Sequence, residues 1–233
     1  AHVAGQVLGH RARMLHAVSP AVTPEATARV QRHAAGAGWL LTLIDGGEFR
    51  DPDYLRNPVD RCYFCKSNLF RRIRAETDAI IATGANTDDL DDFRPGLRAA
   101  EEEGVVHPYV EAGGAKADVR AIARRLRLTD VAELPAQPCL ASRVETGIAI
   151  KASDLDLVRR IEGALADDLG VGDIRCRVVA DGIRVELSPA LLERAAASPF
   201  DKIERMCRAA GKAFLGTAPY RRGSAFLKQR SGP

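Results

Sequence analysis

The chain has 233 residues, of which 46% are hydrophobic, and its 34 basic side chains nearly balance its 31 acidic ones, leaving a net charge of +3. This composition excludes an intrinsically disordered chain and is sufficient for one large domain, or for one medium domain and one small domain. The balanced charge argues against a nucleic-acid partner, and because no apolar run reaches roughly 18 residues, we expect no membrane partner and a cytoplasmic location.

The first half of the chain alternates strand-like and helix-like segments at short spacing, a pattern that predicts βαβ units and a mostly parallel sheet. The predicted strands are Met14–Val18, Leu40–Ile44, Ala79–Thr83 and Val105–Tyr109. The predicted helices are Pro24–Ala37, Lys66–Glu76, Pro95–Glu103 and Lys116–Leu126. Residues 1–8 also have an amphipathic helical pattern. We therefore expect an α/β domain over residues 1–134.

The pattern changes after Leu134, where Pro135 and Pro138 interrupt the alternation and indicate a domain junction. The predicted elements beyond it are a helix over Ser153–Leu169, strands over Ile174–Val179 and Ile183–Leu187, two further helices and a short strand near Ala213–Thr217. Asp181 and Gly182 separate the two longer strands, and Asp-Gly between alternating runs is typical of a β-hairpin. We expect a smaller α+β domain over residues 135–233.

Cys62 and Cys65 form a CxxC pair directly before a predicted helix. This spacing lets two thiolates reach one metal ion or one cluster, and a helix N-terminus can lower their pKa. The alternatives are two buried thiols or half of a zinc knuckle, although no histidine lies near enough in sequence to complete a zinc site. Cys139 is a third candidate ligand. Three cysteines with one open coordination position are what a [4Fe–4S] cluster with one non-protein ligand needs.

The other two cysteines are predicted to be core residues. Cys176 alternates with Arg175 and Arg177 along a predicted strand and so faces away from both, and Cys207 lies on a predicted helix. Arg175 and Arg177 share a strand face, as a clamp for a phosphate or a carboxylate requires. The alternative is a solvated sheet face.

An acidic loop over residues 84–89 follows a predicted strand. Loops at the carboxyl ends of strands bind ligands in α/β sheets, so a nucleotide ribose or a metal ion could occupy this position. The alternative is a solvated turn in which the acidic side chains cap backbone N–H groups.

Taken together, these stretches resemble the ATP-dependent sacrificial sulfur transferases, the larE family of the PP-loop superfamily, over essentially the whole chain. The segments that carry the resemblance are Asn57–Lys66, Gly84–Asp89, Asp92–Gly96, Pro108–Glu111 with Lys116, Pro138–Arg143, and the residues Arg175 and Arg177. The most specific are Cys-Leu-Ala-Ser-Arg over residues 139–143 and Phe-Arg-Pro-Gly over residues 93–96.

The resemblance implies an adenine nucleotide α-hydrolase-like fold and an enzyme that uses ATP and Mg²⁺ to adenylate a carboxylate of a pyridinium dicarboxylate mononucleotide. Sulfur insertion then gives a thiocarboxylate for the nickel-pincer cofactor of lactate racemase. The catalytic residue would be Cys139. It either gives up its own sulfur and becomes dehydroalanine, or joins Cys62 and Cys65 in holding a [4Fe–4S] cluster that binds hydrosulfide. Because all three positions are cysteine here, the resemblance favours the cluster type.

The same resemblance assigns the remaining site residues and the partners. The substrate-binding set is Ser142, Arg143, Arg175, Arg177 and Glu162, the last as a metal or substrate ligand. The AMP-binding set is Gly84, Asn86, Asp88 and Arg94. A homo-oligomer acting on a small-molecule pyridinium nucleotide is expected. The pyrophosphate-binding Ser-Gly-Gly-x-Asp-Ser loop of the family would precede Ala1, so we expect the sequence to be a fragment of a longer enzyme that lacks this N-terminal PP-loop.

Two other interpretations stay open. One is a tRNA or small-molecule thiolase on the same fold, for which no strongly basic stretch provides support. The other is a non-catalytic module in which the cysteines bind a structural metal. An absorption band of an iron–sulfur cluster would separate the enzyme interpretations from a colourless zinc protein.

Overall fold

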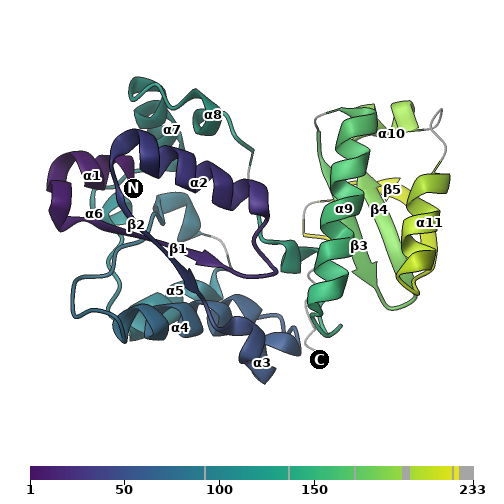
Figure 1. The fold of residues 1–233 in the computed structure, drawn as a ribbon, viewed down its shortest axis with the longest axis horizontal. Helices are drawn as coiled ribbons and strands as arrows, with labels where there is room; N and C mark the ends of the chain where they lie inside the picture. The colour runs from purple at the N-terminus through teal and green to yellow at the C-terminus, as the bar shows by residue number, and fades with distance from the viewer. Residues whose placement is uncertain (92, 136, 171, 196–199, 222, 226–233) are drawn as a thin grey trace. The chain divides into compact units, whose positions relative to one another are not determined.

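The computed structural model describes residues 1–91, 93–135, 137–170, 172–195, 200–221 and 223–225 (Figure 1). Asp92, part of one motif behind the family resemblance, lies outside these residues. The chain divides into two compact units. The first unit comprises residues 1–45, 55–59 and 139–233, and the second comprises residues 46–54 and 60–138. The predicted domain boundary after residue 134 stays a prediction.

The N-terminal part of the first unit is a β-α-β motif preceded by a short helix. The elements are α1 (His2–Leu8), β1 (Arg13–Val18), α2 (Pro24–Ala37) and β2 (Leu40–Asp45). The two strands pair in parallel, with Arg13 opposite Leu40. The side chain of Thr23 caps α2 by accepting the N–H of Ala26 at 3.2 Å, and Gly38 ends it at a left-handed φ of 66°. The predicted helix over residues 24–37 is therefore confirmed at both ends.

The C-terminal part of the first unit is a mixed three-stranded sheet covered by a long helix. Its elements are α9 (Ala152–Leu169), β3 (Ile174–Val179), β4 (Gly182–Leu187), α10 (Pro189–Ala195), α11 (Asp201–Ala209) and β5 (Phe214–Pro219). The strand order is β3-β4-β5, with β3 antiparallel and β5 parallel to β4. Figure 1 shows α9 lying across this sheet. The predicted hairpin and the flanking elements are confirmed to within about two residues.

The core of this sheet explains two of the five cysteines. Cys176 of β3 and Cys207 of α11 are both 0% exposed, as are Leu155 and Ile161 of α9. Burial raises the pKa of the Cys176 thiol well above its ordinary value, and the Glu162 carboxylate raises it further. Burial also raises the pKa of Cys207. The prediction that both are core residues is confirmed.

The second unit is mainly helical in its described residues. Its elements are α3 (Pro52–Leu55), α4 (Arg61–Arg74), α5 (Pro95–Glu102), α6 (Pro108–Glu111), α7 (Lys116–Arg125) and α8 (Thr129–Ala132). The last residue of α3 belongs to the first unit. Helices α4 and α5 pack together and bury Phe70, Ile73, Ala99 and Ala100. The chain as a whole is therefore a mixed α/β structure.

Two of the four predicted parallel strands are wrong in extent. The segments over residues 79–83 and 105–109 meet only in an isolated parallel bridge between Ala82 and Val106. The second segment ends early because Pro108 is the first residue of α6. Proline has no N–H to donate to a strand ladder, while its fixed φ suits the first turn of a helix.

Within the described ranges, no helix combines the length and the apolar character that a membrane span requires.

Candidate functional site

Cys139 opens a short 3₁₀ turn of the first unit, over residues 140–143. The cysteine is exposed, whereas all four residues of the turn are buried. The N–H of Leu140 donates to the carbonyl oxygen of Ala21 at 2.9 Å, which ties the turn to the segment between β1 and α2. The thiol is thus presented at the surface of a turn whose other side chains are packed inside.

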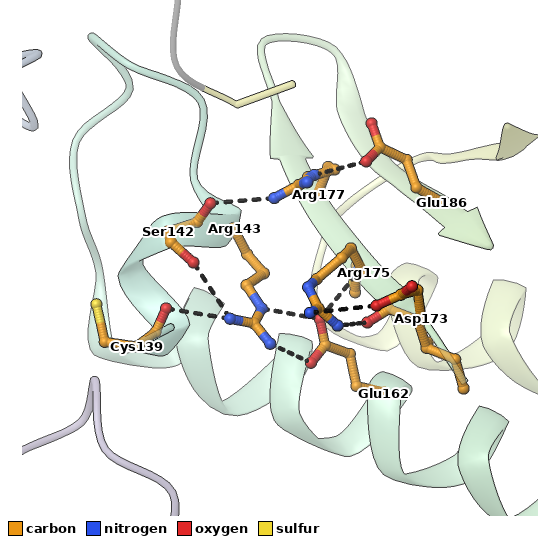
Figure 2. Close-up of polar contacts among 10 residues, drawn as sticks. Cys139, Ser142, Arg143, Glu162, Asp173, Arg175, Arg177 and Glu186 are labelled. Carbon is orange, nitrogen blue, oxygen red and sulfur yellow. Dashed lines mark hydrogen bonds and ion pairs between the residues drawn. The ribbon is translucent and has the colours of Figure 1, made fainter. Parts of the chain in front are cut away.

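Arg143 connects this turn to helix α9 (Figure 2). Its Nε and one terminal nitrogen donate to the two carboxylate oxygens of Glu162, each at 3.0 Å. The other terminal nitrogen donates to the carbonyl oxygen of Cys139 and to Oγ of Ser142, both at 3.2 Å. Glu162 also accepts the N–H of Cys176 at 2.9 Å. A single bidentate pair therefore joins the turn, the helix and the first strand of the sheet.

Arg177 makes a second buried pair on the sheet. Its Nε donates to Oε2 of Glu186 at 3.0 Å, and both side chains are 7% exposed. A terminal nitrogen donates to the carbonyl oxygen of Ser142 at 3.1 Å, and Oγ of Ser224 donates to the same Glu186 at 2.8 Å. A cavity of about 60 Å³ beside this pair, lined in part by Arg184, is too small for a nucleotide.

Arg175 has a different environment from Arg177. It donates to the carbonyl oxygen of Ile174 at 2.8 Å, lies 3.7 Å from the carboxylate of Asp173, and faces the ring of Tyr220 at 5.4 Å. Its side chain is 14% exposed and Asp173 is half-exposed. The structure therefore brings Ser142, Arg143, Glu162 and Arg177 into one contiguous polar network. It places Arg175 on the same strand as Arg177, beside Asp173 and Tyr220.

Asn57 fixes the loop that follows the turn. Its side-chain amide donates to the carbonyl oxygens of Glu145 and Ile148, at 2.8 and 3.0 Å, and more weakly to that of Val144 at 3.4 Å. Its own carbonyl accepts the N–H of Gly147 at 2.9 Å. Asn57 is 0% exposed and has a φ of 56°, a left-handed conformation that asparagine tolerates better than most residues.

Cys62 and Cys65 belong to the second unit. They lie inside the first turns of α4, which begins at Arg61, so the prediction that they precede the helix is wrong. Cys62 is exposed and Cys65 is half-buried. A Cβ at Gly96 of α5 would lie 3.0 Å from Cγ of Lys66 and 3.4 Å from the carbonyl oxygen of Cys62. The absence of a side chain at Gly96 thus allows α5 to approach the cysteine-bearing turn.

The acidic loop of the second unit is held by its own side chains. The residues predicted to bind AMP are Gly84, Asn86, Asp88 and Arg94. Asn86 and Asp89 form a reciprocal capping box, with the N–H of Asn86 donating to Asp89 at 3.1 Å. Asp88 accepts the N–H of Lys116 at 2.7 Å at the start of α7. Arg94 pairs with Asp89 at 2.8 Å. These contacts shape the loop, and the AMP-binding role stays a prediction.

The donor chemistry of three cysteines fits an iron–sulfur cluster. Cys62, Cys65 and Cys139 are all at least partly accessible, whereas Cys176 and Cys207 are buried. Thiolate sulfur is the ligand that such clusters require. Cys139 lies in one unit and the CxxC pair in the other. Across the described residues, no group of three His, Cys, Asp or Glu side chains is gathered as a metal site, and the cluster stays a prediction.

Glu186 is the member of the network that the sequence analysis missed. The Asp-Gly turn at residues 181–182 sets the hairpin register, in which Arg175 lies opposite Glu186 and Arg177 lies opposite Arg184. Glu186 is therefore on the same sheet face as both predicted arginines and diagonal to Arg177. Counting the register outward from the turn would have found it.

Comparisons with known proteins identify three relatives, and no family profile matches the chain. The Synechocystis protein slr1717, described as uncharacterized, is 38% identical over 198 residues, which are 83% of this chain and 73% of that protein. The uncharacterized Methanocaldococcus jannaschii protein MJ0830 is 32% identical over 53% of this chain and 49% of its own length.

The third relative has a functional name. It is the pyridinium-3,5-bisthiocarboxylic acid mononucleotide synthase of Lactiplantibacillus plantarum, 30% identical over 160 residues, which are 66% of this chain and 56% of the synthase. The aligned region thus spans about half the length of this relative and of the Methanocaldococcus relative.

Proposed function

We propose that the chain, which belongs to the same family as the Synechocystis protein slr1717, is an ATP-dependent sulfur transferase that converts a carboxylate of a pyridinium dicarboxylate mononucleotide into a thiocarboxylate. The proposal rests above all on Cys139, whose exposed thiol stands on a buried, arginine-supported turn. The named synthase among the relatives supports the substrate class. The product would serve the synthesis of a nickel-pincer cofactor, as in the maturation of lactate racemase.

The chemistry requires activation before sulfur can be inserted. A carboxylate oxygen is a poor leaving group, so the substrate carboxylate first attacks the α-phosphorus of ATP, forming an acyl adenylate and releasing pyrophosphate. A sulfur nucleophile then attacks the acyl carbon and AMP leaves. With Cys139 as the nucleophile, the product is a thioester to the protein. Removal of the Cα proton of Cys139 then breaks its Cβ–S bond and yields the thiocarboxylate and dehydroalanine, with no oxidant or reductant consumed.

The second source of sulfur involves the three accessible cysteines. Cys62, Cys65 and Cys139 would hold a [4Fe–4S] cluster, and this is the interpretation that we favour because all three positions are cysteine. When bound, such a cluster offers one iron without a protein ligand, at which hydrosulfide can be supplied. Cys139 would then be retained after turnover. The two sulfur sources differ in what they leave behind on the protein, so they can be separated by experiment.

The remaining assignments are part of the same proposal. An adenine nucleotide α-hydrolase-like fold would place ATP, with Mg²⁺, near residues 84–94. The phosphate of the mononucleotide would be met by the arginines and Ser142 near Cys139, with Arg175 offering the guanidinium group that is not in a bidentate pair. We propose a homo-oligomeric, cytoplasmic enzyme without nucleic-acid or membrane partners.

The test is a single-turnover reaction of the complete protein, purified anaerobically, with ATP and the pyridinium dicarboxylate mononucleotide. Thiocarboxylate formation is followed by mass spectrometry of the small molecules, and the peptide containing Cys139 is analysed in parallel. Cys139→Ser should abolish the product. The Cys62→Ser, Cys65→Ser double variant should abolish it only if a cluster supplies the sulfur. Full thiocarboxylate yield from Cys139→Ser would reject the proposed function.

A further inference from the structure

Two separate buried arginine–glutamate pairs donate hydrogen bonds to two carbonyl groups of the turn that carries Cys139. Arg143, paired with Glu162, donates to the carbonyl oxygen of Cys139 at 3.2 Å. Arg177, paired with Glu186, donates to the carbonyl oxygen of Ser142 at 3.1 Å. We infer that these pairs form a clamp that fixes the backbone of residues 139–142, so that the four charged residues position Cys139.

Burial and charge argue for this role. The side chains of Arg143 and Glu162 are 8% and 16% exposed, and those of Arg177 and Glu186 are both 7% exposed. Charges at this depth need a partner of opposite sign. Each carboxylate therefore holds its guanidinium group in place, and each guanidinium group keeps one nitrogen on a carbonyl oxygen of the turn.

Each carboxylate also has an anchor that does not depend on its arginine. Glu162 accepts the backbone N–H of Cys176 in β3 at 2.9 Å, and Glu186 accepts Oγ of Ser224 at 2.8 Å. Glu162 is thus tied to β3, and Glu186 belongs to β4 itself, so each arginine connects the sheet to the turn. The hydrogen bonds to the carbonyl groups of Cys139 and Ser142 consequently restrict the motion of the turn relative to the sheet.

The turn is a single short 3₁₀ segment over residues 140–143. The N–H of Ser142 donates to the carbonyl oxygen of Cys139 at 3.0 Å, and that of Val144 donates to Ala141 at 3.2 Å. Short 3₁₀ segments are weakly stable by themselves. A sulfur nucleophile gains rate from being held close to the acyl carbon, so a loose turn would lower the rate of sulfur insertion. This consequence rests on the proposed function, whereas the clamp itself does not.

The test is hydrogen–deuterium exchange of the whole chain, read by mass spectrometry in peptides covering residues 139–144. The first variant is Glu162→Gln, which keeps the shape of the side chain but removes its charge. The second is the Arg143→Met, Glu162→Leu double variant, because apolar replacement of a buried pair commonly preserves stability while removing the hydrogen bonds from Arg143 to the turn. The control is Asp156→Asn, on the same helix but in exposed ion pairs with Arg159 and Arg160.

We expect exchange in residues 139–144 to be about tenfold faster or more in both clamp variants, with peptides of β4 and the control variant unchanged. Exchange within about twofold of wild type in the double variant would overturn the clamp. In the complete enzyme, Glu162→Gln should lower kcat and leave KM for the mononucleotide unchanged. A raised KM with unchanged kcat and unchanged exchange would instead make Glu162 a substrate ligand. If exchange is faster in the clamp variants but the wild-type enzyme forms no thiocarboxylate, the clamp is supported and the proposed function is rejected.

Discussion

Arg177 of β3 donates to Glu186 of β4 at 3.0 Å, and each side chain is 7% exposed, so neither charge is shielded by water. Removing one partner leaves the other buried and unpaired, and this costs more than the pair itself contributes. The stability of the sheet should therefore be far more sensitive to this pair than to ion pairs on the surface.

We expect Glu186→Ala to lower the free energy of unfolding by about 3–5 kcal/mol. The matched control is Glu204→Ala, because Glu204 is half-exposed and pairs with the exposed Arg208 at 2.7 Å, a pair worth at most about 1 kcal/mol. Urea unfolding followed by circular dichroism measures both. Equal losses of unfolding free energy in the two variants would show that, without Glu186, the Arg177 guanidinium is solvated or pairs with another group.

Gly182 is required by the hairpin in a way that the turn alone does not explain. Its φ is 152°, and an added Cβ would lie 2.3 Å from the carbonyl oxygen of Ala213, next to β5. Gly182→Ala should therefore destabilise the protein by about 3 kcal/mol or more, since backbone must move. Gly163 is the control because it lies in α9 with nothing within 4 Å of a Cβ, and Gly163→Ala should stabilise by about 0.5–1 kcal/mol. Thermal unfolding of the two variants should thus shift in opposite directions.

The buried thiols predict a pH dependence. Burial raises the pKa of Cys176 well above its ordinary value of 9.0, the Glu162 carboxylate adds to this, and burial also raises the pKa of Cys207. The unfolded chain therefore loses these protons at a lower pH than the folded chain. The contribution of the thiols to stability is fully present below the ordinary thiol pKa and is lost as the pH rises from there through the folded-state pKa values.

We expect the free energy of unfolding of the wild-type chain to fall more steeply in alkaline solution than that of the Cys176→Ala, Cys207→Ala double variant. Urea titrations at a series of pH values from neutral upward measure the two slopes. The double variant is less stable at neutral pH because two buried side chains are shortened, so the slopes are compared and not the absolute values. Parallel curves would mean that the two thiols titrate alike in the folded and unfolded states.

Local chemistry made several elements predictable. Thr23, Pro24 and Gly38 specify both ends of α2 within a short stretch of sequence, and Asp181-Gly182 specifies the hairpin. The segment over residues 105–109 was predicted to be a strand from the alternation of strand-like and helix-like segments along the chain, but Pro108 starts a helix there. Pro108 was visible in the sequence, and a proline that suits the first turn of a helix argues against a strand at this position.

The clamp could not be predicted in the same way. Arg143 and Glu162 are 19 residues apart, on a turn and a helix, and only tertiary packing brings them together. The motif around Cys139 predicted Arg143 as a site residue, but it gave no sign that the Arg143 guanidinium donates to the backbone of the turn. The pairing of Arg177 with Glu186 could have been predicted more easily, because the hairpin register alone places the two residues on one sheet face.

Asn57 gives the last prediction, because its amide group holds the loop over residues 144–148 next to the Cys139 turn. Asn57→Asp keeps the size of the side chain but replaces two N–H donors with a carboxylate facing carbonyl oxygens, so we expect a loss of about 3 kcal/mol or more. Asn57→Gly suits the φ of 56° and loses the donors without adding charge, so it should lie between wild type and Asn57→Asp.

The control for the backbone effect is Arg127→Gly. Arg127 has a φ of 57° and is exposed, so its replacement should change stability by no more than about 1 kcal/mol. Urea unfolding gives the order of stability, and hydrogen exchange in residues 144–148 reports the loop directly. Only the amide group changes between asparagine and aspartate. Equal stability of wild type and Asn57→Asp would therefore mean that backbone contacts hold the loop and that the side chain does not. One such contact is the hydrogen bond from the N–H of Gly147 to the carbonyl oxygen of Asn57.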